Sequence, residues 1–269
     1  MSSSQAPGLD TSFSGPRWQD LSWERISSDL LSALRFLTWL PLPGKQTDDG
    51  PANALAFFPL IGFMLGVVLA LLDGLLGFAG LPIMARSALD IVMLIVLTRA
   101  IHLDGLMDSC DGLFGGHDSE QRLQIMRDSR VGSFAVVGCA SILLLKLGFL
   151  DSVTSLERSA SLILAPVLGR WSIVIAAALF PPARPDGMGA AFSTGATIPR
   201  VVVATFFTIL VTVWAAGSTG LVAMAVVWAM VWIVGAAITR LIPGLSGDSF
   251  GMIAEVAEVL TLFCLVLAR

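Results

Sequence analysis

Charged residues are scarce in this chain. Only 13% of its 269 residues are Asp, Glu, Lys or Arg, whereas 55% are hydrophobic. Soluble domains carry roughly 25% charged residues and about 45–50% apolar ones. The imbalance is too large for an enlarged soluble core, and it argues against a soluble globular protein.

Cysteine is scarce as well. Cys110, Cys139 and Cys264 are too few and too scattered for a disulfide framework or a zinc site. The basic residues form no patch, and the chain shows neither an internal repeat nor a nucleic-acid-binding motif. We therefore expect no nucleic-acid partner.

Long apolar runs occupy the segments that lack charged residues. A membrane-spanning helix needs about 20 predominantly apolar residues. Such runs lie at roughly 54–80, 87–101, 131–150, 160–181, 201–217, 219–238 and 252–268. They predict an all-α, polytopic transmembrane bundle of about seven spans in contact with the lipid bilayer. Six spans are the alternative, because the second run is short and only residues 217–220 separate the fifth from the sixth.

The first 50 residues differ in composition. Residues 1–16 are rich in Ser, Gly and Pro, which predicts a disordered tail. Over residues 17–43 the apolar positions follow a helical period among tryptophans and scattered charges, which favours an amphipathic helix in the membrane interface. An ordinary helix packed on the bundle is the alternative. Residues 54–269 are expected to form a single transmembrane catalytic domain.

Lys and Arg are unevenly distributed over the loops. They are concentrated in the N-terminal segment and in loops 102–130, 182–200 and 239–251, whereas the alternate loops carry only Arg86 and Arg158. Because basic loops stay on the cytoplasmic side, the N-terminus and these three loops are predicted to be cytoplasmic. Three polar, Gly-rich segments should therefore meet at one membrane face and form a site between helices.

The first of these loops contains HLDGLMDSCDGLFGG, residues 102–116. On a helix, Asp104, Asp108 and Asp111 stand at i, i+4 and i+7 and point the same way. Three like charges near lipid repel one another, and a divalent cation would neutralise them. Oxygen ligands favour Mg²⁺, or alternatively Mn²⁺, with waters and substrate phosphates completing the shell. The simpler alternative is that the three acids are solvated loop residues.

Phosphate-binding features follow directly. In MRDSR, residues 126–130, Arg127 and Arg130 flank Asp128 at the start of the third span. Arginines and helix N-termini both suit phosphate oxygens. The glycines of the acidic segment, among them Gly115 and Gly116, would let a bulky substrate approach the backbone. A metal and arginines around an anionic group are the general equipment of phosphoryl transfer.

Other polar residues are weaker candidates. His102 is either a base or a structural hydrogen-bond donor. Lys146 and Arg170 lie inside apolar spans, where a charge is usually functional or paired, although Lys146 could instead snorkel. Asp248 and Glu255, on the third cytoplasmic segment, could face the aspartate cluster.

The acidic segment also resembles a known family signature. HLDGLMDSCDGLFGG followed by RLQIMRDSRVGSF is similar to the motif of the cobalamin synthases, the adenosylcobinamide-GDP ribazoletransferase family. Further matches keep the order of that family and cover nearly the whole chain after about residue 30: RFLTWLPLP (35–43), FFPLIGFMLG (57–66), LGRW (168–171), ARPDGMGAAF (183–192) and GLSGDSFGMIAEVAE (244–258). One departure is Trp39, where the family pattern leads us to expect a basic residue.

The resemblance implies a Mg²⁺-dependent enzyme of the bacterial inner membrane. It would join α-ribazole or its 5′-phosphate to adenosylcobinamide-GDP and release GMP, and other cobamide-assembly enzymes would be its protein partners. Asp104, Asp108 and Asp111 would then hold the metal against the pyrophosphate. The implied substrate-binding residues are Arg122, Arg127, Arg130, Gly115, Gly116, Lys146 and Arg170. The choice of proton acceptor stays open among Asp128, Asp248, Glu255 and His102.

Two other classes share some of these features. CDP-alcohol phosphotransferases and prenyltransferases also begin a Mg²⁺ site with D-x-x-x-D. A CDP-alcohol enzyme should show D-G-x-x-A-R, but Met107 and Asp108 replace the Ala-Arg pair. A cation-coupled transporter should show helices broken at mid-membrane and often an internal repeat. The carboxylates here lie at a membrane face instead, which favours an enzyme.

Overall fold

The computed structural model describes residues 23–40, 42, 50–153 and 155–268. This part of the chain is entirely helical. Its elements are α1 (Trp23–Leu37), η2 (Gly50–Phe57, a 3₁₀ helix), α2 (Phe58–Phe78), α3 (Ile83–Leu97), α4 (Ile101–Gly115), α5 (Ser119–Ile125), α6 (Ser133–Ser152), α7 (Ser155–Leu179), α8 (Met188–Gly195), α9 (Ile198–Leu241) and α10 (Gly247–Leu267). The predicted disordered tail, residues 1–16, lies outside the described residues.

Five helices are long and apolar enough to cross a membrane: Pro51–Phe78, Ser133–Ser152, Glu157–Leu179, Ile198–Leu241 and Gly247–Leu267. The chain is therefore a multi-pass membrane protein, with fewer candidate spans than the seven predicted. One reason is that α3 has only 15 residues. At about 1.5 Å per residue it is shorter than the roughly 30 Å hydrocarbon core.

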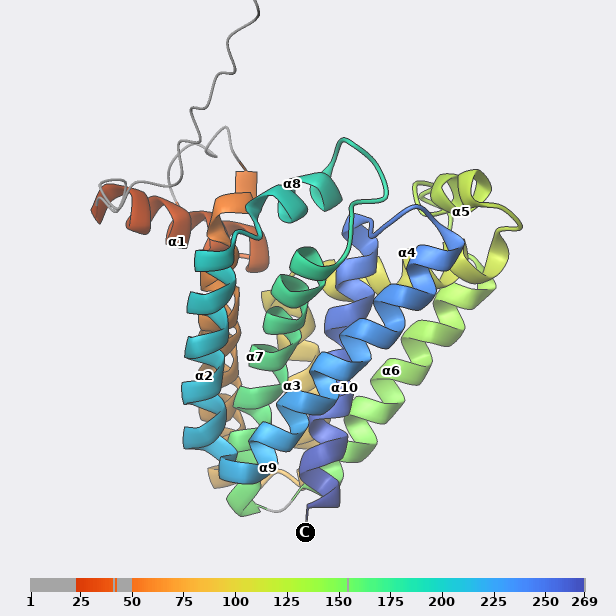
Figure 1. Ribbon diagram of the computed structural model, residues 1–269. Helices are drawn as coiled ribbons and strands as arrows, with labels where there is room; N and C mark the ends of the chain where they lie inside the picture. Colours follow the sequence, from red (N-terminus) through yellow and green to blue (C-terminus); the bar gives the residue numbers. More distant parts are fainter. Residues whose placement is uncertain (1–22, 41, 43–49, 154, 269) are drawn as a thin grey trace, which may run out of the picture.

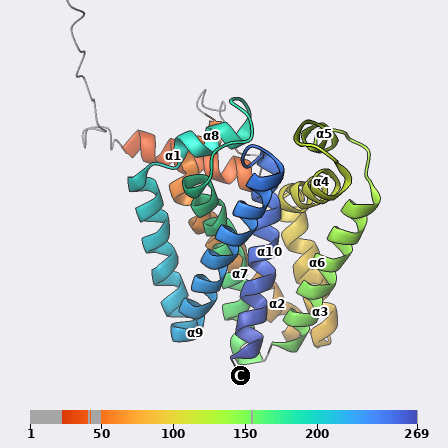
Figure 2. The same ribbon diagram turned by 45° about the vertical axis from the view of Figure 1, so that its right-hand side comes forward.

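The other reason is that α9 is counted as a single helix. Its 44 residues contain both the predicted fifth and the predicted sixth span, which meet at Gly217 with φ 53° and ψ −130°. Figures 1 and 2 show the chain reversing there, so that the two arms of α9 form a helical hairpin. This backbone conformation suits glycine, which has no Cβ.

The long helices run side by side, with α7 and α10 at the centre (Figures 1 and 2). The candidate span of α7 is 89% buried, and that of α10 is 72% buried. Large apolar side chains such as Leu71, Phe206, Trp214 and Ile233 are exposed on the outside of α2 and α9. This outer surface is suited to contact with lipid.

Four shorter helices, α1, α4, α5 and α8, gather at one end of the bundle, and the C-terminus lies at the other (Figures 1 and 2). Within the amphipathic helix predicted over 17–43, the structure has α1, which ends at Leu37. Residues 17–22, 41 and 43 lie outside the described part.

The acidic helix α4 lies across the bundle end rather than continuing α3 (Figure 2). Arg99 and Ala100 separate the two helices with left-handed φ angles of 52° and 56°. Such angles disfavour non-glycine residues by about 1–2 kcal/mol each. This turn swings the aspartates away from the bundle axis and lays them beside the start of α10.

Candidate active site

The three polar loops meet at the end of the bundle that carries α4, α5 and α8. The backbone N–H of Ala183 donates to the carbonyl of Leu245 at 2.9 Å, joining loops 182–200 and 239–251. The Arg184 guanidinium donates to the carbonyl of Leu123 at 2.7 Å, joining the second loop to the first. The convergence predicted from the Lys and Arg distribution is therefore present in the fold.

Helix α4 reaches this position because glycines let it pack closely. A Cβ on Gly105 would lie 2.8 Å from the carbonyl oxygen of Asp248, and one on Gly251 would lie 2.8 Å from that of His102. The two glycines allow α4 and α10 to cross almost backbone to backbone. The crossing sets Asp104 and Asp248 on neighbouring walls of the site.

The two glycines at the end of α4, predicted to bind substrate, differ in their surroundings. A Cβ on Gly116 would meet the Arg122 side chain at 2.4 Å, so this glycine makes room for α5. Gly115 has only side-chain neighbours at 3.9 Å. Neither residue lines the cavities described below.

The predicted metal ligands and phosphate-binding residues share one cavity of about 280 Å³. We call it the carboxylate cavity. Its lining includes Asp104, Asp108, Asp111, Arg127, Asp128 and Arg130. The structure thus brings together the acidic segment and the MRDSR run.

Asp111 differs from the other two acids of α4. Its carboxylate is buried and accepts hydrogen bonds from the backbone N–H groups of Gly132, at 2.6 Å, and Ala135, at 2.8 Å. These donors belong to the start of α6, where helical N–H groups have no partner of their own. Asp111 therefore stabilises the N-terminus of α6, in addition to lining the cavity.

Asp104 and Asp108 are more accessible. Asp104 is exposed and Asp108 is half-buried. Burial, and then the nearby charges of Asp104, Asp248 and Asp111, raise the pKa of Asp108 to about 6. Several carboxylates thus lie within electrostatic range of one another, an arrangement that a bound cation would stabilise.

A protein-only metal cage is not present in the described part of the chain. No three His, Cys, Asp or Glu side chains there lie close enough together to hold a metal ion. Mg²⁺ is commonly held by one or two carboxylates, with substrate phosphates and waters as further ligands. A site built from two aspartates and a substrate fits this chemistry.

The predicted phosphate-binding arginines have three different environments. Arg127 is exposed and lines the carboxylate cavity. Arg130 instead forms an exposed ion pair with Asp128 at 2.5 Å, which lowers the pKa of Asp128 to about 2. Arg122 donates to the carbonyls of Leu113 and Leu241 and so ties α5 to α4 and α9, outside the cavity.

A neighbouring cavity of about 200 Å³ also contains Arg127. We call it the arginine cavity, and its lining includes Arg127, Arg184, Asp186, Met188, Ser246 and Asp248. Arg127 therefore stands between two cavities. Sequence reasoning did not single out Arg184 or Asp186, although both lie in the quoted ARPDGMGAAF segment.

A third cavity of about 160 Å³ adjoins the other two. We call it the aromatic cavity, and its lining includes Phe36, His102, Asp104, Ile173, Met188, Phe192, Asp248 and Phe250. His102 itself is buried, and burial together with Arg170 lowers its pKa well below the usual range. An imidazole held neutral in this way is consistent with a structural role as well as with that of a base.

Three of the remaining candidates form a separate buried network. Lys146 pairs with Glu255 at 2.7 Å and with Glu258 at 2.5 Å, and Glu258 also pairs with Arg170. All four side chains are buried in the bundle. The predicted substrate-binding roles of Lys146 and Arg170, and the catalytic role of Glu255, are thus not supported by placement, because each charge is neutralised by an internal partner.

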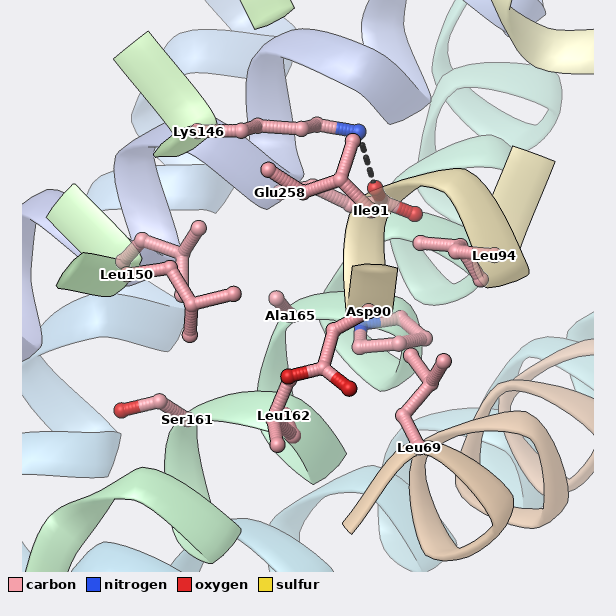
Figure 3. A pocket seen from close by; sticks show the side chains of 12 residues that line it. Leu69, Asp90, Ile91, Leu94, Lys146, Leu150, Ser161, Leu162, Ala165 and Glu258 are labelled. Carbon is pink, nitrogen blue, oxygen red and sulfur yellow. Dashed lines mark hydrogen bonds and ion pairs between the residues drawn. The ribbon is translucent and has the colours of Figure 1, made fainter. Parts of the chain in front are cut away.

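Glu258 was missed as a candidate, although its position one turn after Glu255 in a transmembrane helix is a signal of buried pairing. Figure 3 shows the Lys146–Glu258 pair at one side of an internal cavity of about 30 Å³, with Asp90 and Ser161 also on its walls. A water molecule needs roughly 10–15 Å³ measured in this way. This cavity is therefore large enough for only about two waters, and it excludes a nucleotide.

A second buried network lies toward the opposite end of the bundle. Arg158 pairs with Asp73 at 2.7 Å and with Asp90 at 3.1 Å, and Arg86 also pairs with Asp73. Arg86 and Arg158 are the two basic residues that the sequence assigns to loops on that side. Their charges are neutralised inside the fold, so this cluster has a structural role.

Lys146→Met is expected to destabilise the protein rather than weaken substrate binding. Removing one partner of a buried ion pair typically destabilises by about 3–5 kcal/mol, because the other charge is left unpaired. The melting temperature of the purified variant in detergent measures this effect. Lys146→Met/Glu255→Leu leaves the Arg170–Glu258 pair intact and should melt above the single variant. A stable Lys146→Met protein with a raised KM would instead support a substrate contact.

Comparison with known proteins agrees with the chemistry of this site. The model of the family described as cobalamin-5-phosphate synthase matches residues 29–266. A protein of Desulforamulus reducens named adenosylcobinamide-GDP ribazoletransferase is 34% identical, over 90% of this chain and 97% of its own. Proteins of the same name from Roseiflexus and from Geotalea daltonii are 35% and 37% identical, over 92% and 87% of this chain and 92% and 95% of their own. No solved structure is significantly similar to the chain.

Proposed function

The chain belongs to the cobalamin-5-phosphate synthase family and is an enzyme with adenosylcobinamide-GDP ribazoletransferase activity in cobalamin biosynthesis, and we propose that Asp104 and Asp108 hold a Mg²⁺ ion for this reaction. The family match sets aside a CDP-alcohol phosphotransferase, a prenyltransferase and a transporter. The observation that supports the metal proposal is the gathering of Asp104, Asp108, Asp111 and Asp248 beside Arg127.

The proposed reaction is a displacement at phosphorus. A hydroxyl of α-ribazole, or of its 5′-phosphate, forms a new O–P bond at the phosphate next to the corrinoid. The pyrophosphate P–O bond breaks, and GMP leaves with that electron pair. Mg²⁺ supplies charge neutralisation at the phosphates when it is bound. Mn²⁺ would suit the same oxygen ligands.

We assign Arg127 as the residue that binds the phosphates and neutralises their charge. It lines both the carboxylate cavity and the arginine cavity. Within the described residues the guanidinium of Arg127 donates no hydrogen bond and forms no ion pair, so its N–H groups are available to a phosphate. Arg130 is engaged by Asp128 and is assigned a secondary role.

We assign Asp248 as the carboxylate that accepts the proton of the attacking hydroxyl. It lines both the arginine cavity and the aromatic cavity. Asp128 is a poor base because Arg130 holds its pKa at about 2. Glu255 is buried and paired with Lys146, and so has no access to a substrate. The contact of Asp248 with the Ser246 hydroxyl, at 3.4 Å, helps to orient its carboxylate.

The proposed function is tested by incubating the purified protein with its two substrates. GMP should appear only when adenosylcobinamide-GDP, α-ribazole and a divalent cation are all present. The product should have the mass of adenosylcobalamin. GMP release without an acceptor would indicate a hydrolase, and full activity after removal of divalent cations would contradict the metal proposal.

We further propose that the site faces the cytoplasm of a bacterial inner membrane. The loops at the site end contain Arg122, Arg127, Arg130, Arg184 and Arg240, whereas Arg86 and Arg158 at the other end are both paired inside the fold. Basic loops are retained on the cytoplasmic side.

Single cysteines in a cysteine-free background are expected to reveal this orientation. Glu120→Cys, Pro185→Cys and Pro243→Cys place exposed reporters at the site end, and Ser218→Cys places one in the α9 hairpin at the other end. A membrane-impermeant maleimide should label the first three only in inverted vesicles and the fourth only from the periplasm. Periplasmic labelling of any site-end reporter would contradict the proposed orientation.

A further inference from the structure

The aromatic cavity has a chemistry that the metal and phosphate roles do not use. We propose that it binds the aromatic base of the acceptor nucleoside, a flat and apolar bicyclic heterocycle. This inference rests on the proposed function and names the subsite for one of its substrates. Ribazole consists of a ribose that carries such a base, so its two halves require different surroundings.

The walls of the cavity are aromatic and come from separate elements. Phe192 of α8 lies at their centre, with ring centroids 5.6 Å from Phe36 of α1 and 5.3 Å from Phe250 of α10. Phe58 packs on the same ring from α2, at 5.5 Å. The pairs with Phe36 and Phe58 are edge-to-face and the pair with Phe250 is tilted. Such packing holds the rings in fixed positions and is suited to an aromatic ligand.

The charges around the cavity argue against a phosphate ligand. Among its described lining residues there is no Lys or Arg to bind a phosphate directly, and its carboxylates are Asp104 and Asp248. It therefore has no cationic side chain for a pyrophosphate or a nucleoside monophosphate. The basic residues Arg127 and Arg184 lie instead in the carboxylate and arginine cavities. The part of a substrate bound here is therefore uncharged.

The position of the cavity fits a nucleoside whose base enters first. Asp104 belongs to both the aromatic and the carboxylate cavities, and Asp248 belongs to both the aromatic and the arginine cavities. A base held among Phe36, Phe192 and Phe250 would place its ribose at the two aspartates. There the ribose hydroxyl meets the proposed proton acceptor and the phosphate-binding residues.

The size of the cavity selects the acceptor rather than the donor. A volume of about 160 Å³ is close to that of an engineered cavity of about 150 Å³ that binds benzene, so it suits a flat aromatic base and is far too small for a corrin ring. Helix α1 contributes Phe36 and helix α8 contributes Met188 and Phe192 to the lining. Both helices lie at the same end of the bundle (Figures 1 and 2). We therefore assign acceptor specificity to these two helices together with the start of α10.

Two variants with opposite effects on cavity size test this subsite. Phe250→Leu removes part of an aromatic wall, and Ile173→Phe reduces the space. Both should raise the KM for α-ribazole by about 10-fold or more, since even one extra or missing methylene in an apolar pocket is worth about 10–200-fold. The kcat and the KM for adenosylcobinamide-GDP should change little. In Ile173→Phe, the KM for a riboside with a smaller, monocyclic imidazole base should increase less than the KM for α-ribazole.

Phe263→Leu is the matched control, because Phe263 lies on the same helix, α10, but outside all three cavities. Phe36→Leu replaces Phe250→Leu if that variant fails to fold. Binding of α-ribazole without donor, followed by the fluorescence of its base, should weaken in parallel with the KM. If wild type forms no GMP, the proposed function fails. If wild type is active but the cavity variants match Phe263→Leu, the subsite is wrong.

Discussion

Asp108→Asn is expected to abolish ribazole transfer while leaving the protein folded. The substitution keeps the shape of the side chain and removes one negative charge from the proposed Mg²⁺ site. Loss of metal stabilisation worth about 4 kcal/mol in the transition state corresponds to a rate about 10³-fold lower. Turnover measured as GMP formation at saturating Mg²⁺ is the readout.

The same variant should be at least as stable as wild type without Mg²⁺. The pKa of Asp108 rises from 3.8 to about 6 in the folded protein, so its ionisation destabilises the fold as the pH rises through this window. Asn removes that penalty, and the melting temperature at neutral pH should stay level or increase. Asp151→Asn, an exposed aspartate at the end of α6, is the control. Near wild-type turnover of Asp108→Asn would show that Asp108 is not a metal ligand.

Arg127→Ala is expected to reduce kcat by about 10²–10³-fold. Removing one preoriented donor at the position of developing charge has an effect of this size in other enzymes. Arg127 lines both cavities that are suited to phosphates, whereas Arg130 is engaged by Asp128 and its side chain is 87% exposed. The kcat of Arg130→Ala should therefore fall by less than about 10-fold, which is the range expected for an exposed ion pair.

Steady-state kinetics with both substrates separate the roles of these arginines. Arg127→Lys should recover part of the kcat, because an ammonium keeps the charge but not the forked geometry of a guanidinium. The KM for α-ribazole should be unaffected in all three variants. Equal losses in Arg127→Ala and Arg130→Ala would remove the distinction drawn here between a phosphate ligand and a surface ion pair.

Patterns that are local in the chain could be interpreted from the sequence. Apolar runs of membrane length predict the all-α bundle, because the hydrocarbon thickness sets a minimum helix length. The i, i+4, i+7 spacing of Asp104, Asp108 and Asp111 predicts a shared face, because helix geometry alone determines it. The loop distribution of Lys and Arg predicts which segments meet, and the fold brings those segments together.

The number of candidate spans depends on features that hydropathy does not detect. The short α3 ends at a turn with two left-handed residues, Arg99 and Ala100. A window average of about 19 residues does not resolve such a turn. The break of α9 at Gly217, by contrast, lies at the position where the sequence separates the fifth and sixth apolar runs.

Which charges are available for chemistry was decided by tertiary contacts alone. Lys146 and Glu258 are 112 residues apart in sequence yet form a buried pair, and Asp111 accepts hydrogen bonds from the start of α6. A charge in an apolar interior requires a partner, and the packing of the helices determines which one it meets. The sequence could therefore identify the carboxylates and arginines as candidates but could not assign their partners. Only the fold separated those that face the cavities from those that hold the bundle together.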